Sequence, residues 1–356
     1  MGEHGRLKER IAAEIARDGP IPFERFMEMA LYDPDGGYFA TGPLRSHERG
    51  DFLTSPEVSP EFGTVLARYV EGEYDRLGRP RCFTVLEAGA GSGSLLDALL
   101  GELSFTPRVV ASEASRAARE AIGDRLPEVE VTLPDRLPHR FRGVVIANEL
   151  FDNLPMAIAV RGGDGWTERW VALDGAELVM VEAPARREVV AWLDAHAANT
   201  PRGGVVECQL EAAAWLTRMI GKLVAGSLLV FDYGDTTEGL LARRKEGTLR
   251  TYRSHHLGPH PLDEPGTTDL TADVNFSALY EVARDTGMEC ELLRQCEFLT
   301  RLGLGDRLRR LRREELELAR SGNPIERLRV RSKVKEIETL LHPRGLGDFR
   351  VLIGRH

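Results

Sequence analysis

Short apolar runs that alternate with helical patterns from residue 81 onward constrain the fold of this chain most. Five such runs have the length of strands and lie at 82–86, 109–112, 129–133, 141–147 and 228–232. Mainly apolar runs are typical of strands that are buried on both faces of a parallel sheet, and helices between the strands cover those faces. The alternation therefore predicts an α/β fold, a parallel sheet with helices on both sides.

The first 80 residues have a different pattern. Leu7, Ile11 and Ile15 recur at the spacing of one helix face, and another amphipathic helix follows a stretch at 32–60 rich in Asp, Gly, Pro and Ser. We expect a helical N-terminal cap at 1–80 and a core at 81–356. Three inserts are expected in this core: an elaboration of the sheet edge at about 155–225, a loop or lid at 235–275, and basic helices at 303–342.

Charge is distributed unevenly along the chain. The 56 acidic and 47 basic residues give a net charge of −9, which argues against a general nucleic-acid binder. Residues 301–335 contain twelve Lys or Arg and five Asp or Glu, a local net charge of +7, so the remainder carries −16. We interpret this basic segment as a solvated helix pair, with contact to an acidic partner as the alternative. No apolar run approaches the ~20 residues of a membrane-spanning helix.

Cysteine content and the N-terminus bear on location. Cys82, Cys208, Cys290 and Cys296 form no CxxC pair, and four cysteines are too few for a secreted domain built on disulfides. We expect reduced, buried thiols. The acidic residues of the N-terminus fit neither a secretory signal nor an acid-poor transit peptide. Together these features predict a cytoplasmic protein.

A glycine-rich turn after the first predicted strand is the sharpest local signal. Residues 87–93 read EAGAGSG, with Gly89, Gly91 and Gly93, and a helix follows. Glycines let the backbone turn tightly and approach a ligand, and the helix start offers free N–H groups. A dinucleotide site would read GxGxxG, but here the third glycine comes one position early. With the acidic Glu87 before it, the turn is typical of methyltransferases that use S-adenosyl-L-methionine.

The chemistry of that cofactor explains the acidic residues. S-adenosyl-L-methionine has an ammonium, a carboxylate and a sulfonium but no phosphate, so Glu87 can help to hold the ammonium. Glu113 ends the second predicted strand, 20 residues after Gly93, where a carboxylate can accept both ribose hydroxyls. Asp135 follows the third strand and is a candidate for the adenine amino group, with an ordinary surface aspartate as the alternative.

Several further segments match one family in order, over nearly the whole chain. They are GDFLTSPEVSPEFG at 50–63, ANELFDNLP at 147–155, LVFDYG at 229–234, PGTTDLTADVNF at 265–276, CEFLTRLGL at 296–304, and the stretch at 340–354. The sequence resembles the MidA-like family of class I S-adenosyl-L-methionine-dependent methyltransferases, relatives of the mitochondrial complex I assembly protein arginine methyltransferase. One departure is Ser92, where mitochondrial relatives commonly have arginine.

The resemblance implies a Rossmann-like class I fold with a seven-stranded sheet and an antiparallel last strand. Segments 289–298 and 349–353 would then be strands six and seven, with the basic helices between them. It also implies S-adenosyl-L-methionine as the methyl donor and methylation of a protein arginine. Residues Thr54, Ser55 and Pro56 would fold over the cofactor; helix capping by Ser55, with Pro56 in the first turn, is the alternative.

Candidates for the transfer step follow the fourth strand, where class I enzymes place the acceptor. An arginine acceptor stays protonated in free solution, with a pKa above ~12, so carboxylates must orient its planar group. We expect Glu149 and Asp152 to be these catalytic carboxylates and Asn148 to lie nearer the cofactor. The alternative is that either carboxylate caps a helix.

A second set of polar residues is expected along the acceptor channel: Asp269, Asp273 and Asn275, with Asp232 and Tyr233 below them. For Thr271, capping the helix that begins near Phe276 is the alternative. His255, His256 and His260 lie in a loop with no cysteine nearby, so we expect no metal site there.

Three functions fit the sequence. The first is a protein arginine methyltransferase, the second a small-molecule methyltransferase with the same cofactor site, and the third a non-catalytic assembly or binding protein. The intact glycine turn with Glu87 and Glu113 argues against the third. The expected partners are a protein substrate or a small-molecule acceptor, without nucleic acid or a membrane span, and a homodimer is left open.

Overall fold

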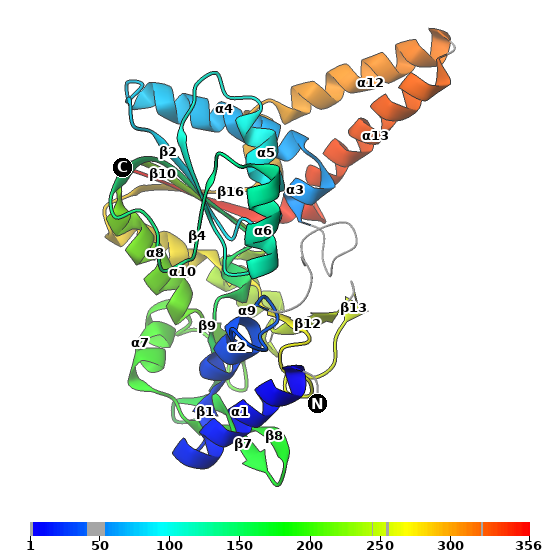
Figure 1. The fold of residues 1–356 in the computed structure, drawn as a ribbon. Coiled ribbons are helices and arrows are strands. Elements are labelled where there is room, and N and C mark those ends of the chain that lie inside the picture. Colours follow the sequence, from blue (N-terminus) through cyan, green and yellow to red (C-terminus); the bar gives the residue numbers. More distant parts are fainter. Residues whose placement is uncertain (1–2, 41–53, 244, 254–255, 322) are drawn as a thin grey trace.

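The computed structural model describes residues 3–40, 54–243, 245–253, 256–321 and 323–356. Its central element is a seven-stranded sheet with the order β16-β17-β10-β5-β2-β3-β4 (Figure 1). The strands are β2 (Thr84–Ala88), β3 (Arg108–Ser112), β4 (Glu130–Thr132), β5 (Phe141–Asn148), β10 (Leu223–Asp232), β16 (Glu289–Arg294) and β17 (Arg350–Arg355). Only β17 runs antiparallel to its neighbours in this sheet, as the class I fold requires. The predicted α/β fold is confirmed.

Helices cover both faces of the sheet. The helices of one face include α4 (Glu61–Arg76), α5 (Ser94–Leu100) and α6 (Arg116–Arg125), and those of the other include α8 (Leu210–Lys222) and α10 (Phe276–Asp285). Val85 and Leu86 are neighbours in β2, yet they belong to different hydrophobic cores. Successive side chains of a strand point to opposite faces, so a strand covered on both sides must be apolar at every position.

The insert between β5 and β10 forms a sheet of its own instead of extending the edge of the main sheet. Four strands of this sheet come from the insert: β6 (Ala157–Arg161), β7 (Trp166–Asp174), β8 (Glu177–Pro184) and β9 (Val205–Cys208). Helix α7 (Arg187–His196) lies between β8 and β9, and the fifth strand, β1 (Ile21–Pro22), comes from the N-terminal segment. Helices α1 (Glu3–Asp18) and α2 (Phe23–Tyr32) share a core with this sheet, for example through Phe26 and Val171. The expected edge elaboration at 155–225 is therefore wrong, because β7 pairs with β1 from the N-terminal segment.

The first 80 residues thus contribute to two parts of the molecule. Helices α1 and α2 pack on the smaller sheet, whereas α3 (Ser55–Val58) and α4 lie against the main sheet (Figure 1). Part of the cap motif, residues 50–53, lies outside the described residues. The division of the chain at residue 80 stays a proposal.

The stretch at 235–275 contains short elements where a loop was expected. They are β11 (Gly234–Asp235), α9 (Thr237–Arg243), β12 (Arg250–Arg253), β13 (His256–Leu257), β14 (Asp269–Thr271) and β15 (Val274–Asn275). Strand β12 pairs with β13 and β14, and β11 pairs with β15. These pairings hold the segment beside the carboxyl end of β10.

The C-terminal insert begins earlier than expected, because β16 ends at Arg294 and α11 (Gln295–Arg301) follows directly. The Arg294 N–H donates to the Glu297 carboxylate over 3.1 Å, which starts the helix. Helices α12 (Leu304–Ser321) and α13 (Pro324–Leu340) form the predicted basic pair and project from the body as a hairpin (Figure 1). A short helix η2 (Leu346–Asp348) then leads into β17.

Cysteine burial differs from the expectation. Cys208 is buried, but Cys82 is exposed and Cys290 and Cys296 are partly exposed. Cys82 precedes β2 and so lies outside the covered part of the sheet. Within the described ranges, no helix combines the length and apolar character needed to cross a membrane.

Candidate active site

A cavity of about 720 Å³ lies at the carboxyl ends of β2, β3 and β5, where parallel α/β sheets bind ligands. Most of the residues expected to bind the cofactor line it: Thr54, Pro56, Glu87, Gly89, Gly91, Glu113, Asp135 and Asn148. Ser55 and Gly93 do not line the cavity. Its remaining wall includes Tyr32, Phe39, Trp215 and Met219, which come from the N-terminal segment and α8.

The glycine turn adopts backbone angles that favour glycine. The φ angles of Gly89, Gly91 and Gly93 are +72°, +53° and +76°, all in the left-handed region. Gly93 stands at the N-cap of α5, and a Cβ there would lie 3.2 Å from Ile122. Gly93 therefore permits close packing of α5 and α6, while Gly89 and Gly91 form the cavity wall.

Glu113 organises this turn through backbone hydrogen bonds. Its Oε2 accepts from the Gly91 N–H over 2.9 Å, and its Oε1 accepts from the Ser115 N–H over 2.7 Å. Burial raises the pKa of Glu113, and these donors counteract the rise. A carboxylate has about four acceptor positions, so ribose hydroxyls can still bind beside the two backbone donors.

Two buried polar atoms of the cavity wall have no partner among the described residues. They are Glu87 Oε2 and Asn148 Oδ1, on side chains that are 3% and 7% exposed. Burial holds the pKa of Glu87 well above its usual range. Buried acceptors without a partner are uncommon in folded proteins, and these two fit a ligand with ammonium or hydroxyl donors. S-adenosyl-L-methionine has both.

Helix α3 is fastened to the glycine turn by Glu57. The Glu57 carboxylate accepts hydrogen bonds from the hydroxyls of Ser92 and Ser94, the latter over 3.0 Å. Ser55 begins α3, and its hydroxyl accepts a hydrogen bond from the Gln295 side chain, so the Ser55 side chain connects α3 to α11 and not to the cavity. The alternative role for Ser55, capping of this helix, does not hold, because Thr54 is the N-cap residue and Ser55 is the first residue of the helix.

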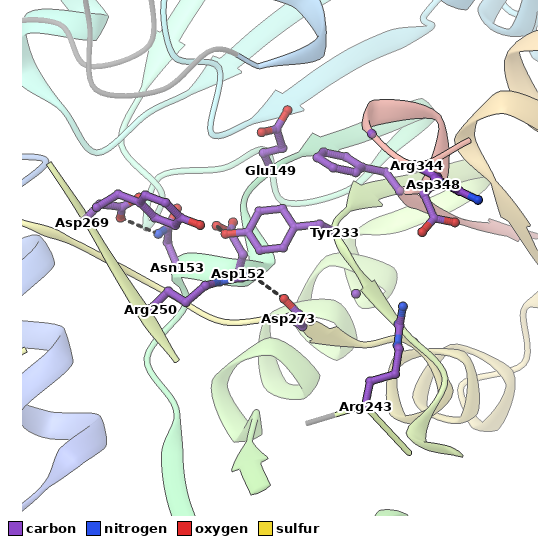
Figure 2. A pocket seen from close by; sticks show the side chains of 14 residues that line it. Glu149, Asp152, Asn153, Tyr233, Arg243, Arg250, Asp269, Asp273, Arg344 and Asp348 are labelled. Atoms are coloured by element: carbon purple, nitrogen blue, oxygen red, sulfur yellow. Dashed lines mark hydrogen bonds and ion pairs between the residues drawn. The ribbon is translucent and has the colours of Figure 1, made fainter. Parts of the chain in front are cut away.

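A second cavity, of about 500 Å³, is drawn in Figure 2. Its wall includes Glu149, Asp152, Tyr233, Asp269 and Asp273, all of which the sequence placed near the acceptor. Glu149 and Asn153 line both cavities. Asn275 and Asp232 lie outside its lining.

Asp152 lies in the short helix η1 (Phe151–Asn153) and is 4% exposed. Its Oδ2 accepts from the Tyr233 hydroxyl over 2.5 Å and from the Thr271 hydroxyl over 2.6 Å. Its Oδ1 has no partner among the described residues. Burial raises the pKa of Asp152, and the two hydroxyl donors counteract that rise. The carboxylate is thus fixed in orientation and one of its oxygens has no partner. A helix-capping carboxylate would instead accept from backbone N–H groups of the helix.

Asp232, the last residue of β10, supports η1 from below. Its Oδ2 accepts from the backbone N–H groups of Phe151 and Asp152 over 2.9 and 3.3 Å. Its Oδ1 accepts from the Tyr233 N–H over 3.0 Å. Burial holds the pKa of Asp232 well above its usual range. Asp232 therefore positions Asp152 and Tyr233 without lining either cavity.

Glu149 has an unusual backbone for a residue other than glycine, with a φ of +50°. Its N–H donates to the Phe231 carbonyl oxygen over 2.8 Å, which fixes that conformation between β5 and β10. Its Oε1 accepts from the Ser55 N–H over 3.1 Å and from the Asn148 amide over 3.3 Å. Burial, with the nearby charge of Asp152, raises the pKa of Glu149 to about 8. Strained backbones of this kind cluster at functional sites.

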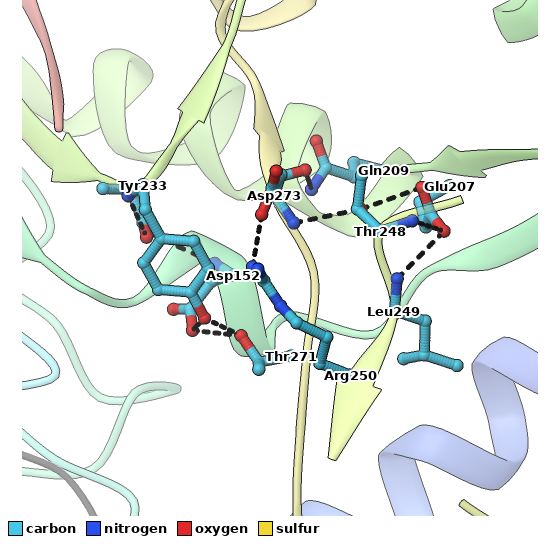
Figure 3. A network of polar contacts seen from close by, with 10 residues as sticks. Asp152, Glu207, Gln209, Tyr233, Thr248, Leu249, Arg250, Thr271 and Asp273 are labelled. Atoms are coloured by element: carbon cyan, nitrogen blue, oxygen red, sulfur yellow. Dashed lines mark hydrogen bonds and ion pairs between the residues drawn. The ribbon is translucent and has the colours of Figure 1, made fainter. Parts of the chain in front are cut away.

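A polar network continues from this cavity into the smaller sheet (Figure 3). Arg250 pairs with Asp273, and its guanidinium lies 5.4 Å from the centre of the Tyr233 ring. The Asp273 N–H donates to the Thr248 hydroxyl over 3.1 Å. The Glu207 carboxylate in turn accepts from the Thr248 N–H over 2.7 Å, so β9 anchors the start of β12.

The structure reverses the roles of two residues in the 265–276 motif. Asn275 Oδ1 accepts from the Ala278 N–H over 3.2 Å and so caps α10, whereas Thr271 binds Asp152. Helix α10 begins at Phe276, so Asn275 is the adjacent residue and Thr271 is too far away. The sequence did not point to Arg250 and Arg344 in the second cavity or to Trp215 in the first. Strand and helix patterns account for Arg250 and Trp215, and Arg344 lies in a turn where an exposed arginine is ordinary.

Comparison with known proteins agrees with this geometry. Residues 65–293 match the family model described as "Putative S-adenosyl-L-methionine-dependent methyltransferase". A Drosophila melanogaster protein named protein arginine methyltransferase NDUFAF7 homolog, mitochondrial, is 30% identical over 90% of this chain and 80% of its own. The Homo sapiens protein arginine methyltransferase NDUFAF7, mitochondrial, is 28% identical over 94% of this chain and 80% of its own.

A solved structure supports both the fold and the cofactor. The crystal structure of a Burkholderia thailandensis protein bound to S-adenosyl-homocysteine has a TM-score of 0.86 and 31% identity. The similarity covers 99% of this chain and 92% of that protein.

The expected location does not agree with the relatives. These proteins are named as mitochondrial, which contradicts the prediction of a cytoplasmic protein. The prediction rested on the low cysteine content and on the acidic residues of the N-terminus. A low cysteine content argues against an oxidising compartment but does not distinguish one reducing compartment from another.

The family match covers more than half of the chain, and its cofactor agrees with the glycine turn and the unsatisfied acceptors of the first cavity. The relatives extend the match to nearly the whole sequence. This chain therefore belongs to the MidA-like family and is an S-adenosyl-L-methionine-dependent methyltransferase.

Proposed function

We propose that this enzyme methylates the guanidinium group of an arginine in a protein substrate, and that the second cavity, of about 500 Å³, receives this arginine. The observation that carries the proposal is the position of Glu149, which lines both cavities. A methyl acceptor must reach the donor directly, with reacting atoms about 3 Å apart. A cavity that shares a wall with the cofactor cavity meets this need. The names of the relatives support arginine as the acceptor.

The charge of the shared wall suits a guanidinium. Neither Glu149 nor Asp152 forms an ion pair with a described residue, and Asp152 Oδ1 is buried without a partner. A guanidinium carries five N–H donors in a planar fork, which matches carboxylates on one wall. Binding it would supply a hydrogen bond to Asp152 Oδ1 and a positive charge beside both carboxylates. We assign Glu149 and Asp152 the role of orienting the acceptor.

The first cavity would hold the cofactor, which supplies an electrophilic methyl group. Glu87 and Asn148 have unused acceptors for its ammonium and hydroxyl groups, and Glu113 has acceptor positions for the ribose. The left-handed Gly89 and Gly91 allow its close approach to the backbone. Asp135 stands at the exposed end of the wall and is the candidate for the adenine amino group.

A proton must leave the acceptor during the reaction. The guanidinium nitrogen forms a bond to the methyl carbon as the bond from that carbon to sulfur breaks, and the methylated nitrogen then loses one proton. Glu149 would accept this proton, because it lines both cavities and because its pKa, raised to about 8, makes it a stronger base than an ordinary glutamate. Asp152 would keep the guanidinium in orientation through its free Oδ1.

Transfer from labelled cofactor tests the proposal. Purified protein is incubated with methyl-labelled S-adenosyl-L-methionine and a cell lysate, and the products are analysed by mass spectrometry. We expect the label on arginine side chains of a protein. Label confined to the small-molecule fraction would instead favour the small-molecule methyltransferase, and an absence of any transfer would favour a non-catalytic protein; either result overturns the proposal.

A further inference from the structure

The acceptor cavity is lined by acidic and by basic side chains. Arg344 lines it, and the Arg344 guanidinium makes no hydrogen bond or ion pair with the residues that the structure describes. Figure 2 shows Arg344 on the side of the cavity opposite Asp269 and Asn153. Glu149 and Asp152 are the carboxyl groups of the shared wall, and neither forms an ion pair with a described residue.

The other cations of the cavity are already paired. Arg243 pairs with Asp235, which also accepts from Arg350 over 2.6 Å, and Arg250 pairs with Asp273. Arg344 therefore differs from the other arginines that line the cavity, because no ion pair joins it to a described carboxylate. Asp348 also lines the cavity, but its carboxylate pairs with Arg294 over 3.6 Å. An arginine of this kind is available to an anionic group of a ligand.

The backbone around Arg344 is fixed by a tight connection between α13 and η2. The Arg344 N–H donates to His342 Nδ1 over 3.2 Å, and the Gly345 N–H donates to the His342 carbonyl oxygen over 3.1 Å. A Cβ on Gly347 would lie 2.6 Å from the Leu341 carbonyl carbon, so the chain can make this close approach only with glycine. The turn that follows α13 thus places Arg344 at the wall of the cavity.

We propose that the acceptor carries a carboxylate close to its guanidinium, and that Arg344 recognises this carboxylate. The inference rests on the proposed arginine acceptor and adds a second charge to it. A ligand with a guanidinium and a carboxylate would neutralise both unpaired walls, whereas a purely cationic ligand would leave Arg344 facing a like charge. The carboxylate can come from the α-carboxylate of arginine itself or from an acidic residue next to the arginine in a peptide.

Arg344 acts on specificity and not on the transfer step. It is exposed, so solvent weakens its attraction for a carboxylate to about 1 kcal/mol, or a preference of about fivefold. The preference should lower KM and Kd for the carboxylate-bearing ligand and leave kcat little changed, because the contact with the carboxylate is the same before and during methyl transfer.

Binding to protein saturated with S-adenosyl-homocysteine tests the inference without turnover. One arm titrates L-arginine against agmatine, which has the same guanidinium and no carboxylate. The other arm titrates blocked peptides that have Asp before or after the arginine against the same peptides with Asn. We expect about fivefold tighter binding of the carboxylate-bearing ligand in one arm, which identifies its source, and loss of that preference in Arg344→Glu. KM and kcat of the same pairs provide a second readout.

Arg313→Glu is the matched control. Arg313 is exposed on α12 outside the cavity lining, so this variant makes the same charge change and should retain the preference. The inference is overturned if wild type shows no preference in either arm, or if the preference persists in Arg344→Glu. If no guanidinium ligand binds wild type at all, the proposed arginine acceptor itself is wrong. That result is distinct from guanidinium binding that is indifferent to Arg344.

Discussion

The Ser55 N–H donates a hydrogen bond to Glu149 Oε1 over 3.1 Å, across 94 positions of sequence. Ser55 begins α3 in the N-terminal segment, and Glu149 follows β5 at the junction of the two cavities. The same α3 is tied to the glycine turn through Glu57. One short helix therefore contacts both the proposed cofactor site and the proposed acceptor site.

Replacing Asp152 with Asn should preserve cofactor binding and abolish most methyl transfer. The amide oxygen can still accept from Tyr233 and Thr271, but the charge that faces the acceptor is lost. We expect kcat/KM to fall by about 100-fold, or about 2.7 kcal/mol of transition-state stabilisation. Titration with S-adenosyl-homocysteine should give an unchanged Kd. Turnover equal to wild type would show that Asp152 has no part in the reaction.

The reaction should accelerate as pH rises towards 8. Because burial raises the pKa of Glu149 to about 8, its proton-accepting form is scarce at lower pH. We expect kcat/KM of wild type to rise about tenfold per pH unit below 8 and to level off above it. The Glu149→Gln variant should be much slower and should lack this rise. The same rise in that variant would assign the titration to another group.

The same raised pKa predicts an effect on stability. An unfolded glutamate titrates near 4.3, so between that pH and about 8 the folded protein holds a proton that the unfolded chain has lost. Wild type should therefore lose stability over this window as pH rises. Glu149→Gln removes this contribution, and its Tm should gain on that of wild type from pH 5 to pH 8. A constant difference in Tm would show that Glu149 does not titrate in this way.

Replacing Gly91 with Val should eliminate cofactor binding. Gly91 has a φ of +53° in the cavity wall, which a β-branched residue does not adopt without strain. Gly175→Val is a matched control, because Gly175 has a φ of +60° with open space around it in a turn far from the cavity. Both variants should lower Tm, but only Gly91→Val should lose S-adenosyl-homocysteine in calorimetry. Equal affinities for both would refute the role of the turn.

Removing the Glu57 carboxylate should weaken cofactor binding by about tenfold. Glu57→Ala leaves the hydroxyls of Ser92 and Ser94 without their acceptor, and a hydrogen bond to a charged group contributes about 1.5 kcal/mol or more. Glu317→Ala on the exposed surface of α12 is the control. Calorimetric titration with S-adenosyl-homocysteine measures the change. An affinity unaltered by Glu57→Ala would mean that α3 does not close the cofactor site.

Local patterns in the sequence were sufficient for the main sheet and the glycine turn. The apolar runs that became β2, β3, β5 and β10 are continuous because both of their faces are covered, so burial left a readable signal. The left-handed turn needed glycines and showed them. Glu149 and Asp152 were predictable as a pair because they follow the same strand.

Pairing between distant segments was not predictable in the same way. Nothing in residues 21–22 indicates that they pair with β7, so the smaller sheet was mistaken for an extension of the larger one. Thr271 carries no mark of its hydrogen bond to Asp152, since a threonine before a helix is equally suited to capping.

The sequence by itself determined the methyltransferase fold, the glycine turn and the carboxylates after β5. Only the tertiary structure decided that Glu149 lines two cavities, that Asp152 keeps one oxygen without a partner, and that Arg344 lines the second cavity. The reason is physical: periodicity and turn chemistry are local properties of the chain, whereas a cavity and its charge balance depend on segments that meet only after folding.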